Sequence, residues 1–360
     1  MKKTILITAL LFATLAFSQI KISGIVRDKE TKEPLQGASI FAPNTTNGGS
    51  TDDKGSFSFT LSENQNEVII SYVGYETVLV PAASLSDATK SNIILLTPII
   101  NTLKEVVIRK ISAKDRAKYM AIFNRGFIGF GTIAENTKIL NPEVLQFDMN
   151  SDNTLLIVSA DEPIQMINKK TGYQISYELV YFENKVTSQE KNEQLTTYFG
   201  YPFFKDIVAE KKLDPKKTAQ TRLKCYKGST MHFIRSLYDG TMEKEGFTVR
   251  KFKREKTPHI PVEYKDIYET NDCMVHQLVF ERDNKKYLYF TDFLSVHHPS
   301  EEHKKLQCSQ LKLLVDKPIE IYTNGNYADP DTLANYGYMG WQKMGEMLPF
   351  DYQPDPIITE

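Results

Sequence analysis

Three residues near position 300 carry the side chains of a metal-dependent hydrolase. His298 and Glu301 form a His-x-x-Glu pattern, and His303 follows two positions later. Two imidazoles and one carboxylate are a common ligand set for catalytic zinc, where the ion activates a bound water. The spacing makes His298, Glu301 and His303 candidate metal ligands, with His297 and Glu302 as alternatives in the same stretch.

Two features of the sequence weigh against this site. Pro299 prevents His298 and Glu301 from sharing the interior of a regular helix, because proline lacks the backbone N–H donor. No histidine follows His303 in the chain. We therefore expect a polar loop between strands at 289–296 and 310–315. A metal-assisted hydrolase with its site in residues 112–360 stays as the alternative function.

Other catalytic signatures are not found in the sequence. It contains no G-x-S-x-G elbow and no P-loop. Cys225 and His232 are expected on neighbouring turns of one helix, beyond the hydrogen-bond reach that Cys–His catalysis needs. With Cys273 and Cys308, Cys225 matches no zinc spacing, and the three thiols permit either one disulfide or three buried side chains. The sequence thus predicts no catalytic residue and no cofactor.

The stretch from Ser50 to Phe59 resembles a cation-binding loop at first sight. Asp52 and Asp53 precede Gly55, but the oxygen-bearing positions of an EF-hand are not matched in either frame. Short Asp-Gly sequences also turn the chain, because glycine accepts a positive φ and aspartate bonds the backbone ahead of it. We predict structural turns at Asp52, Asp53 and Gly55, and another at Gly74.

Aromatic and basic clusters offer two candidate binding surfaces. Tyr201 lies in the aromatic run 198–204, and Trp341 is the only tryptophan. Exposed rings can stack on sugars, although a packed turn explains the run equally well. The basic run 250–256 is expected to be a solvated strand end with Phe252 inside, and contact with an anionic lipid or polysaccharide is the alternative.

Composition and charge limit the class of protein. Hydrophobic residues make up 41% and charged residues 25% of the 360-residue chain, which is typical of a folded globular protein. The formal net charge of −1 gives no general argument for nucleic acid as a partner.

The first eighteen residues have the layout of a secretory signal peptide. Lys2 and Lys3 precede an apolar run at 5–17, and Ser18 ends a short segment with the small residues typical of a cleavage site. No cysteine follows this run directly, so a lipoprotein anchor is not expected. No later segment reaches the roughly 18 apolar residues of a membrane span. We expect an exported protein without a transmembrane segment, periplasmic or associated with the outer membrane.

Residues 19–109 read as an all-β antiparallel sandwich of about seven short strands, separated by turn-forming residues. Phe57, Phe59 and Leu61 alternate with polar residues and should face its core. Residues 112–360 read as a strand-rich α+β region. One helix is expected to begin at Ser112, and a second to run from Asp214 to Asp239. A third, short helix is expected to begin at Asp329.

The N-terminal region resembles the carboxypeptidase-regulatory-like domain, a transthyretin-like sandwich, in its exported Bacteroidota form. The matching residues are Gly24, Val26, Asp28, Pro34, Leu35, Gly37, Ala38, Asn44, Thr45, Thr46, Thr51, Asp52, Gly55, Phe57, Gly74, Tyr75 and Glu76. The resemblance implies a module that often precedes TonB-dependent receptors. The remaining chain is far too short for such a receptor barrel, so the protein is not expected to be a receptor itself. The C-terminal region resembles an uncharacterised companion region.

Together these observations favour a non-catalytic exported cell-envelope protein. The sandwich would act as a stability or docking module, and the C-terminal region would recognise another cell-envelope protein or a glycan.

Overall fold

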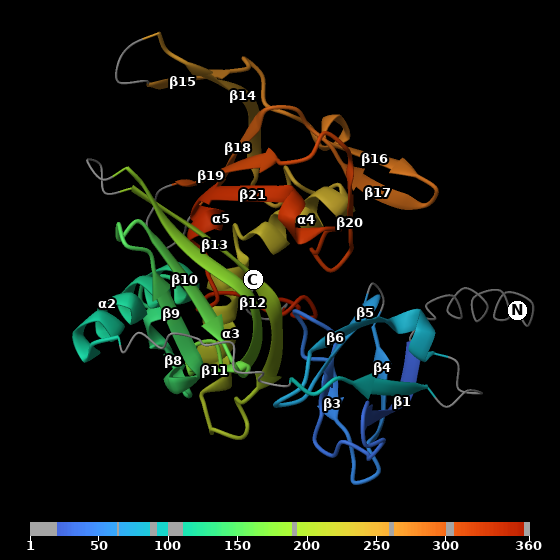
Figure 1. The fold of residues 1–360 in the computed structure, drawn as a ribbon. Helices are drawn as coiled ribbons and strands as arrows, with labels where there is room; N and C mark the ends of the chain where they lie inside the picture. Colours follow the sequence, from blue (N-terminus) through green and yellow to red (C-terminus); the bar gives the residue numbers. More distant parts are fainter. Residues whose placement is uncertain are drawn as a thin grey trace, which may run out of the picture. The chain divides into compact units, whose positions relative to one another are not determined.

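The computed structural model describes residues 20–62, 65–86, 92–99, 111–188, 193–258, 263–299 and 306–355. Contacts between backbone positions divide the chain into two compact units, residues 1–107 and 108–360 (Figure 1). The expected signal peptide, residues 1–18, lies outside the described residues.

The first unit is a sandwich of two sheets, as the sequence predicted. Its strands are β1 (Ile20–Asp28), β2 (Ser39–Phe41), β3 (Gly48–Ser50), β4 (Ser56–Leu61), β5 (Glu67–Ser71), β6 (Val78–Pro81) and β7 (Ile93–Leu96), with a 3-10 turn at Ala82–Leu85. One sheet has the order β4-β1-β7 and the other β3-β2-β5-β6. The pairing is antiparallel except between β1 and β7, which run parallel.

Side-chain alternation along β4 builds one side of this core. Phe57 and Leu61 are buried and Phe59 is partly buried, while Ser58 and Thr60 are exposed. The predicted inward face of this strand is confirmed. Its apolar side chains pack with those of β1, β2 and β5, including Ile22.

The second unit begins with a helix on a six-stranded sheet. Helix α2 (Ala113–Phe123) continues into a π-helical turn at Asn124–Ile128. The strands are β8 (Thr137–Ile139), β9 (Leu145–Met149), β10 (Leu155–Ala160), β11 (Ile164–Asn168), β12 (Tyr173–Ser188) and β13 (Glu193–Asp206), in the order β8-β11-β12-β10-β9 with β13 beside β12. Two further 3-10 turns span Ala134–Asn136 and Pro142–Val144. Phe123 and Phe127 are buried in this core, and Tyr119 is partly buried against it.

The rest of the second unit carries a five-stranded and a three-stranded sheet. Their orders are β15-β14-β18-β19-β21 and β16-β17-β20. The strands are β14 (Thr248–Lys256), β15 (Tyr264–Tyr268), β16 (Val279–Arg282), β17 (Lys285–Leu288), β18 (Phe293–Pro299), β19 (Leu306–Leu313), β20 (Ile319–Ile321) and β21 (Leu333–Gly337). A 3-10 turn at Val275–Gln277 precedes β16.

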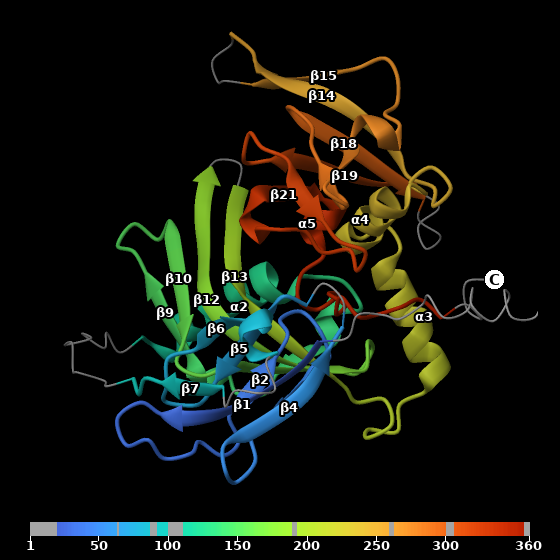
Figure 2. The same ribbon diagram turned by 90° about the vertical axis from the view of Figure 1, so that its right-hand side faces the viewer.

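The single helix expected from Asp214 to Asp239 is two helices. Helix α3 (Pro215–Tyr226) ends before Gly228, whose φ is +75°, and α4 (Thr230–Asp239) starts after Ser229. The Ser229 side chain accepts a hydrogen bond from the His232 N–H and caps the new helix. Figure 2 shows α3 and α4 as separate helices. The apolar residues continue at helical spacing across Gly228, so the sequence pattern did not indicate this break.

The short helical stretch expected to start at Asp329 is a single 3-10 turn. Pro330–Thr332 makes one 3-10 turn, and the chain then enters β21. A four-residue helix, α5 (Tyr338–Trp341), follows β21. The Thr332 hydroxyl donates a hydrogen bond to the Asp329 carbonyl and so closes this single turn.

Candidate functional site

The candidate metal ligand His298 lies inside a strand. His297 and His298 belong to β18, so the polar loop expected at these two positions is wrong; they pair with Cys308 and Gln307 of β19. The His298 side chain is buried. Its ring centroid lies 4.7 Å from that of Phe247 and 5.3 Å from that of His232.

Glu301 and His303 lie outside the described residues. Within the ranges that the structure describes, no group of three or more His, Cys, Asp or Glu side chains has a geometry that could hold a metal ion. His298 is instead surrounded by side chains of α4 and the segment that follows it.

His232 links the break between α3 and α4 to the segment after α4. Its Nδ1 accepts a hydrogen bond from the Gly228 N–H at 3.1 Å, and its Nε2 lies 3.2 Å from Glu245 Oε2. Nδ1 therefore holds the lone pair, and Nε2 carries the proton that Glu245 accepts. Burial lowers the pKa of His232 to about 4, although the hydrogen bond that His232 donates to Glu245 acts in the opposite direction; the neighbouring His298 lowers the pKa further. The ring is neutral at pH 7.

The cysteines do not form a reactive group with His232. Cys225 lies in α3 and His232 in α4, so the two are not on one helix as expected. Cys225 and Cys273 are buried and Cys308 is exposed, and no disulfide joins them. Burial raises the pKa of the Cys273 thiol, which disfavours the reactive thiolate.

The Asp52 carboxylate organises the turn before β4. Its Oδ1 accepts hydrogen bonds from the backbone N–H groups of Lys54 and Ser56, at 2.9 and 2.8 Å. Gly55 has φ +71°, and a Cβ there would lie 2.5 Å from the Val26 carbonyl oxygen. The Asp53 side chain is exposed. These contacts are those of a turn that aligns β4 with β1.

The two arginines of the basic run are paired with carboxylates along β14. Arg250 pairs with Asp272, and Arg254 pairs with Asp266 through two hydrogen bonds of 2.7 Å. Phe252 between them is buried, as predicted. An anion would have to compete with these carboxylates for the guanidinium groups.

Tyr201 belongs to a row of rings on β12 and β13. The ring of Phe199 lies 5.2 Å from that of Tyr201 and 6.3 Å from that of Tyr181, centroid to centroid. Tyr201 is half-buried and Tyr181 is 39% exposed.

Trp341, at the end of α5, pairs with Phe130, and both rings are exposed. Trp341 is 59% exposed and Phe130 is 51% exposed. Their ring centroids lie 6.1 Å apart with an angle of 54° between the planes. The Arg125 guanidinium lies 5.8 Å from the Phe130 ring centroid. We call Arg125, Phe130 and Trp341 the aromatic platform.

Backbone hydrogen bonds hold the two halves of the aromatic platform together. The N–H groups of Met344 and Gly345 donate to the carbonyls of Phe127 and Ile128, each at 3.0 Å. The buried Asn168 side chain donates to the Gly345 carbonyl at 2.9 Å. The segments that carry Phe130 and Trp341 are therefore joined next to the exposed rings.

Glycines set the direction of Phe130. Gly129 and Gly131 have φ of +97° and +106°, which side-chain-bearing residues rarely adopt. The sequence pattern selected Trp341 but not Arg125 or Phe130. The only local signal for Phe130 is its position between two glycines.

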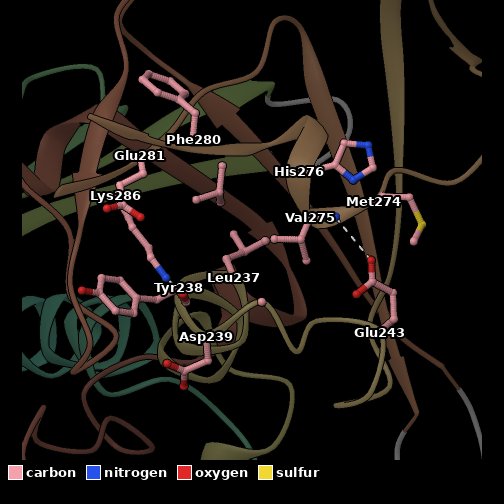
Figure 3. Close-up of a pocket in the computed structure, with 12 residues that line it drawn as sticks. Leu237, Tyr238, Asp239, Glu243, Met274, Val275, His276, Phe280, Glu281 and Lys286 are labelled. Carbon is pink, nitrogen blue, oxygen red and sulfur yellow. Dashed lines mark hydrogen bonds between the residues drawn. The ribbon is translucent and has the colours of Figure 1, made fainter. Parts of the chain in front are cut away.

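A second surface feature is a cavity of about 450 Å³ at the C-terminal end of α4 (Figure 3). Its walls come from that helix end, the turn Val275–Gln277 and the β16–β17 hairpin. Figure 3 shows Leu237 and Val275 at its centre, with Asp239, Glu243 and Glu281 around them. No sequence pattern indicated this cavity, because three separate segments meet there.

Comparison with known proteins identifies the first unit. Residues 22–108 match the model of the family described as CarboxypepD_reg-like domain. None of the curated proteins compared with the chain matches it. In the described part of the chain, no helix has the length and apolar character needed to cross a membrane.

One solved structure, from Bacteroides fragilis NCTC 9343, is described as that of a proposed membrane-associated protein of unknown function. It covers 89% of this chain and 95% of its own, with 11% identity and a TM-score of 0.17. The first unit combines the predicted sandwich, the Asp52–Gly55 turn and the family match over residues 22–108. Residues 22–108 are therefore a carboxypeptidase-regulatory-like domain.

Proposed function

We propose that this chain is a non-catalytic, exported binding protein of the cell envelope, whose second unit binds a glycan on the aromatic platform. The observation that carries the proposal is the exposed pair of Phe130 and Trp341, held together by hydrogen bonds beside it. A rigid exposed aromatic pair is costly in water and is common at binding surfaces.

The shape of the aromatic platform suits a sugar ring. Sugars have apolar C–H faces and polar edges. A sugar-binding site therefore offers the face of an aromatic side chain to the C–H groups and hydrogen-bonding groups to the sugar hydroxyls. The two rings meet at 54°, which leaves an angled surface, and Arg125 lies over one of them. The exposed Thr132 lies two residues after Phe130 and adds a hydroxyl beside the rings. A flat protein partner would favour a wider apolar surface around the rings.

The first unit would serve as a docking or stability module. Strand β7 ends its sheet among the described strands, and it presents Ile93 and Leu95, 55% and 40% exposed, on its outer face. Sheet edges can bind an added strand from another protein. This favours attachment to another cell-envelope protein through the sandwich while the second unit binds its ligand.

Export rests on the signal-peptide pattern of residues 1–18. A fusion of these residues to a reporter that is active only outside the cytoplasm should give active reporter. A fusion with the apolar run interrupted by two arginines should not. Equal activity from both fusions would contradict export by this route.

The glycan proposal is tested by retention on insoluble cell-envelope polysaccharide. The wild-type protein should be retained, and Trp341→Ala should weaken retention about tenfold, corresponding to loss of one good contact. Tyr264→Ala is the matched control, because Tyr264 is also 59% exposed but lies on β15. No retention of the wild type, or equal loss with Tyr264→Ala, would dispose of the proposal. Retention on envelope proteins after the polysaccharide is digested would favour a protein partner instead.

A further inference from the structure

The floor of the cavity at the end of α4 is apolar. Leu237 is fully buried, and Val275 and Val279 are partly exposed into the space between the helix end and the β16–β17 hairpin. A volume of about 450 Å³ lies in the range of ligand sites and holds one or two long side chains. An occupant therefore needs an aliphatic part that can replace water on Val275 and Val279.

The rim of the cavity is acidic. Glu243 accepts a hydrogen bond from the Val275 N–H at 3.3 Å, which places one carboxylate beside the floor. The carboxylates of Asp239 and Glu281 are exposed, and no side chain in the described ranges forms an ion pair with either. Helix α4, ten residues long, ends here with Gly240 in the left-handed region, so the negative end of its dipole adds to these charges.

The one lysine of the cavity already has protein partners. Lys286 Nζ donates to the Tyr238 carbonyl at 2.6 Å and lies 4.5 Å from the centroid of the Tyr238 ring. Its charge is thus directed to the α4 end and away from the open space. Three carboxylates against one such ammonium leave the rim negative, so charge complementarity selects a cation.

Apolar side chains continue the surface beyond the cavity. Met274 is 48% exposed and Phe280 is 41% exposed, and both belong to the cavity wall. Methionine and phenylalanine are enriched where proteins meet proteins. A free amine would leave these side chains in water, whereas a protein carrying the cation would cover them.

We propose that this cavity binds a lysine or arginine side chain of a partner protein. The alkyl stem of that side chain lies on Val275 and Val279, which pack beside the buried Leu237, and its charged head lies among Asp239, Glu243 and Glu281. The partner segment on either side of it covers Met274 and Phe280. This site uses different residues from the aromatic platform, so either can exist without the other.

A labelled peptide of alternating leucine and lysine tests the proposal by fluorescence anisotropy with the full chain. Wild-type protein should bind it, and Asp239→Asn and Glu281→Gln should each weaken binding about fivefold or more. Glu162→Gln, an exposed carboxylate before β11, should leave the affinity unchanged. Raising the salt concentration should weaken binding, because the rim charges are exposed. Thermal melting of each variant shows that it is folded.

Three results would overturn the proposal. One is the absence of peptide binding by the wild type, and another is equal affinity in Asp239→Asn, Glu281→Gln and Glu162→Gln. The third concerns the source of the cation. If n-hexylamine displaces the peptide at concentrations near the peptide's own dissociation constant, the site recognises a free amine and the partner-protein assignment fails. A peptide with norleucine in place of lysine should not bind.

Discussion

The Tyr75 hydroxyl donates a hydrogen bond of 2.6 Å to Asp28 Oδ2, and so ties the loop after β5 to the end of β1. The other oxygen of Asp28 accepts from the N–H groups of Glu30 and Thr31. Both Asp28 and Tyr75 are among the residues on which the family resemblance rested. Their contact joins the Gly-Tyr-Glu sequence at 74–76 to an aspartate that is distant in the chain.

Tyr75→Phe should lower the melting temperature of the first unit by several degrees. The hydrogen bond from Tyr75 is the largest cause that lowers the pKa of Asp28, so the variant should raise that pKa towards its ordinary value. Carbonyl NMR of Asp28 across the acid range measures this. Tyr72→Phe is the control, since its ring packs 5.4 Å from that of Tyr75 but does not reach Asp28 in the described contacts. An unchanged Asp28 pKa in Tyr75→Phe would contradict the contact.

Gly55→Ala should destabilise the protein more than Gly74→Ala. Both glycines have a positive φ, +71° and +83°, which costs an alanine about 1–2 kcal/mol. Only at Gly55 would the added Cβ meet backbone, 2.5 Å from the Val26 carbonyl oxygen; nothing lies within 4 Å of it at Gly74. Chemical denaturation gives the two free energies of unfolding. Equal losses would show that the Gly55 turn is not packed against β1.

Calcium should leave the stability of the wild-type protein unchanged. Both Asp52 hydrogen bonds go to backbone N–H groups of the turn, so its Oδ1 is already engaged. Melting curves recorded with calcium and with a chelator measure this. A clear rise in melting temperature with calcium would reopen the Asp52–Gly55 stretch as a cation site.

Acid should destabilise the second unit through His232. Its pKa is about 4 in the folded protein and about 6.5 in the unfolded chain, so the unfolded chain takes up the proton first as pH falls. This contribution is fully present above pH 6.5 and is lost towards pH 4. It amounts to something on the order of 3 kcal/mol. Burial also lowers the pKa of His298, which acts in the same direction.

His232→Asn keeps an acceptor for the Gly228 N–H and cannot titrate. Its free energy of unfolding should therefore fall less steeply between pH 6.5 and 4 than that of the wild type. His276→Asn, at an exposed position outside the His232 contacts, is the control variant. Equal slopes in His232→Asn and the wild type would refute the role of His232.

Local signals predicted much of the fold. The alternation of Phe57, Phe59 and Leu61 and the turn at Gly55 depend on neighbours in sequence, and they led correctly to the sandwich. The break at Gly228 was also visible locally, as a glycine followed by a capping serine, but the apolar spacing on both sides outweighed it. His298 was misjudged because its burial depends on pairing with β19 and packing on α4.

The candidate sites were harder to foresee. Trp341 could be selected as the only tryptophan, but its partner Phe130 is distant in sequence and is brought close by the hydrogen bonds of Met344 and Gly345 to the Phe127–Ile128 carbonyls. The cavity beside Asp239 lies between the end of α4 and the β16–β17 hairpin, which is distant from α4 in the chain. Contacts of this kind arise from packing and leave no periodic pattern in the chain.

Tryptophan fluorescence tests the aromatic platform most directly, since Trp341 is the only tryptophan and reports from the site itself. Titration of the full chain with soluble polysaccharide released from the cell envelope should give a saturable blue shift and protection from acrylamide quenching. Phe130→Ala should weaken this response about tenfold, and Tyr264→Ala should leave it unchanged. Emission that stays constant while the polysaccharide binds, or a Phe130→Ala variant that binds as tightly as the wild type, would contradict recognition at this site.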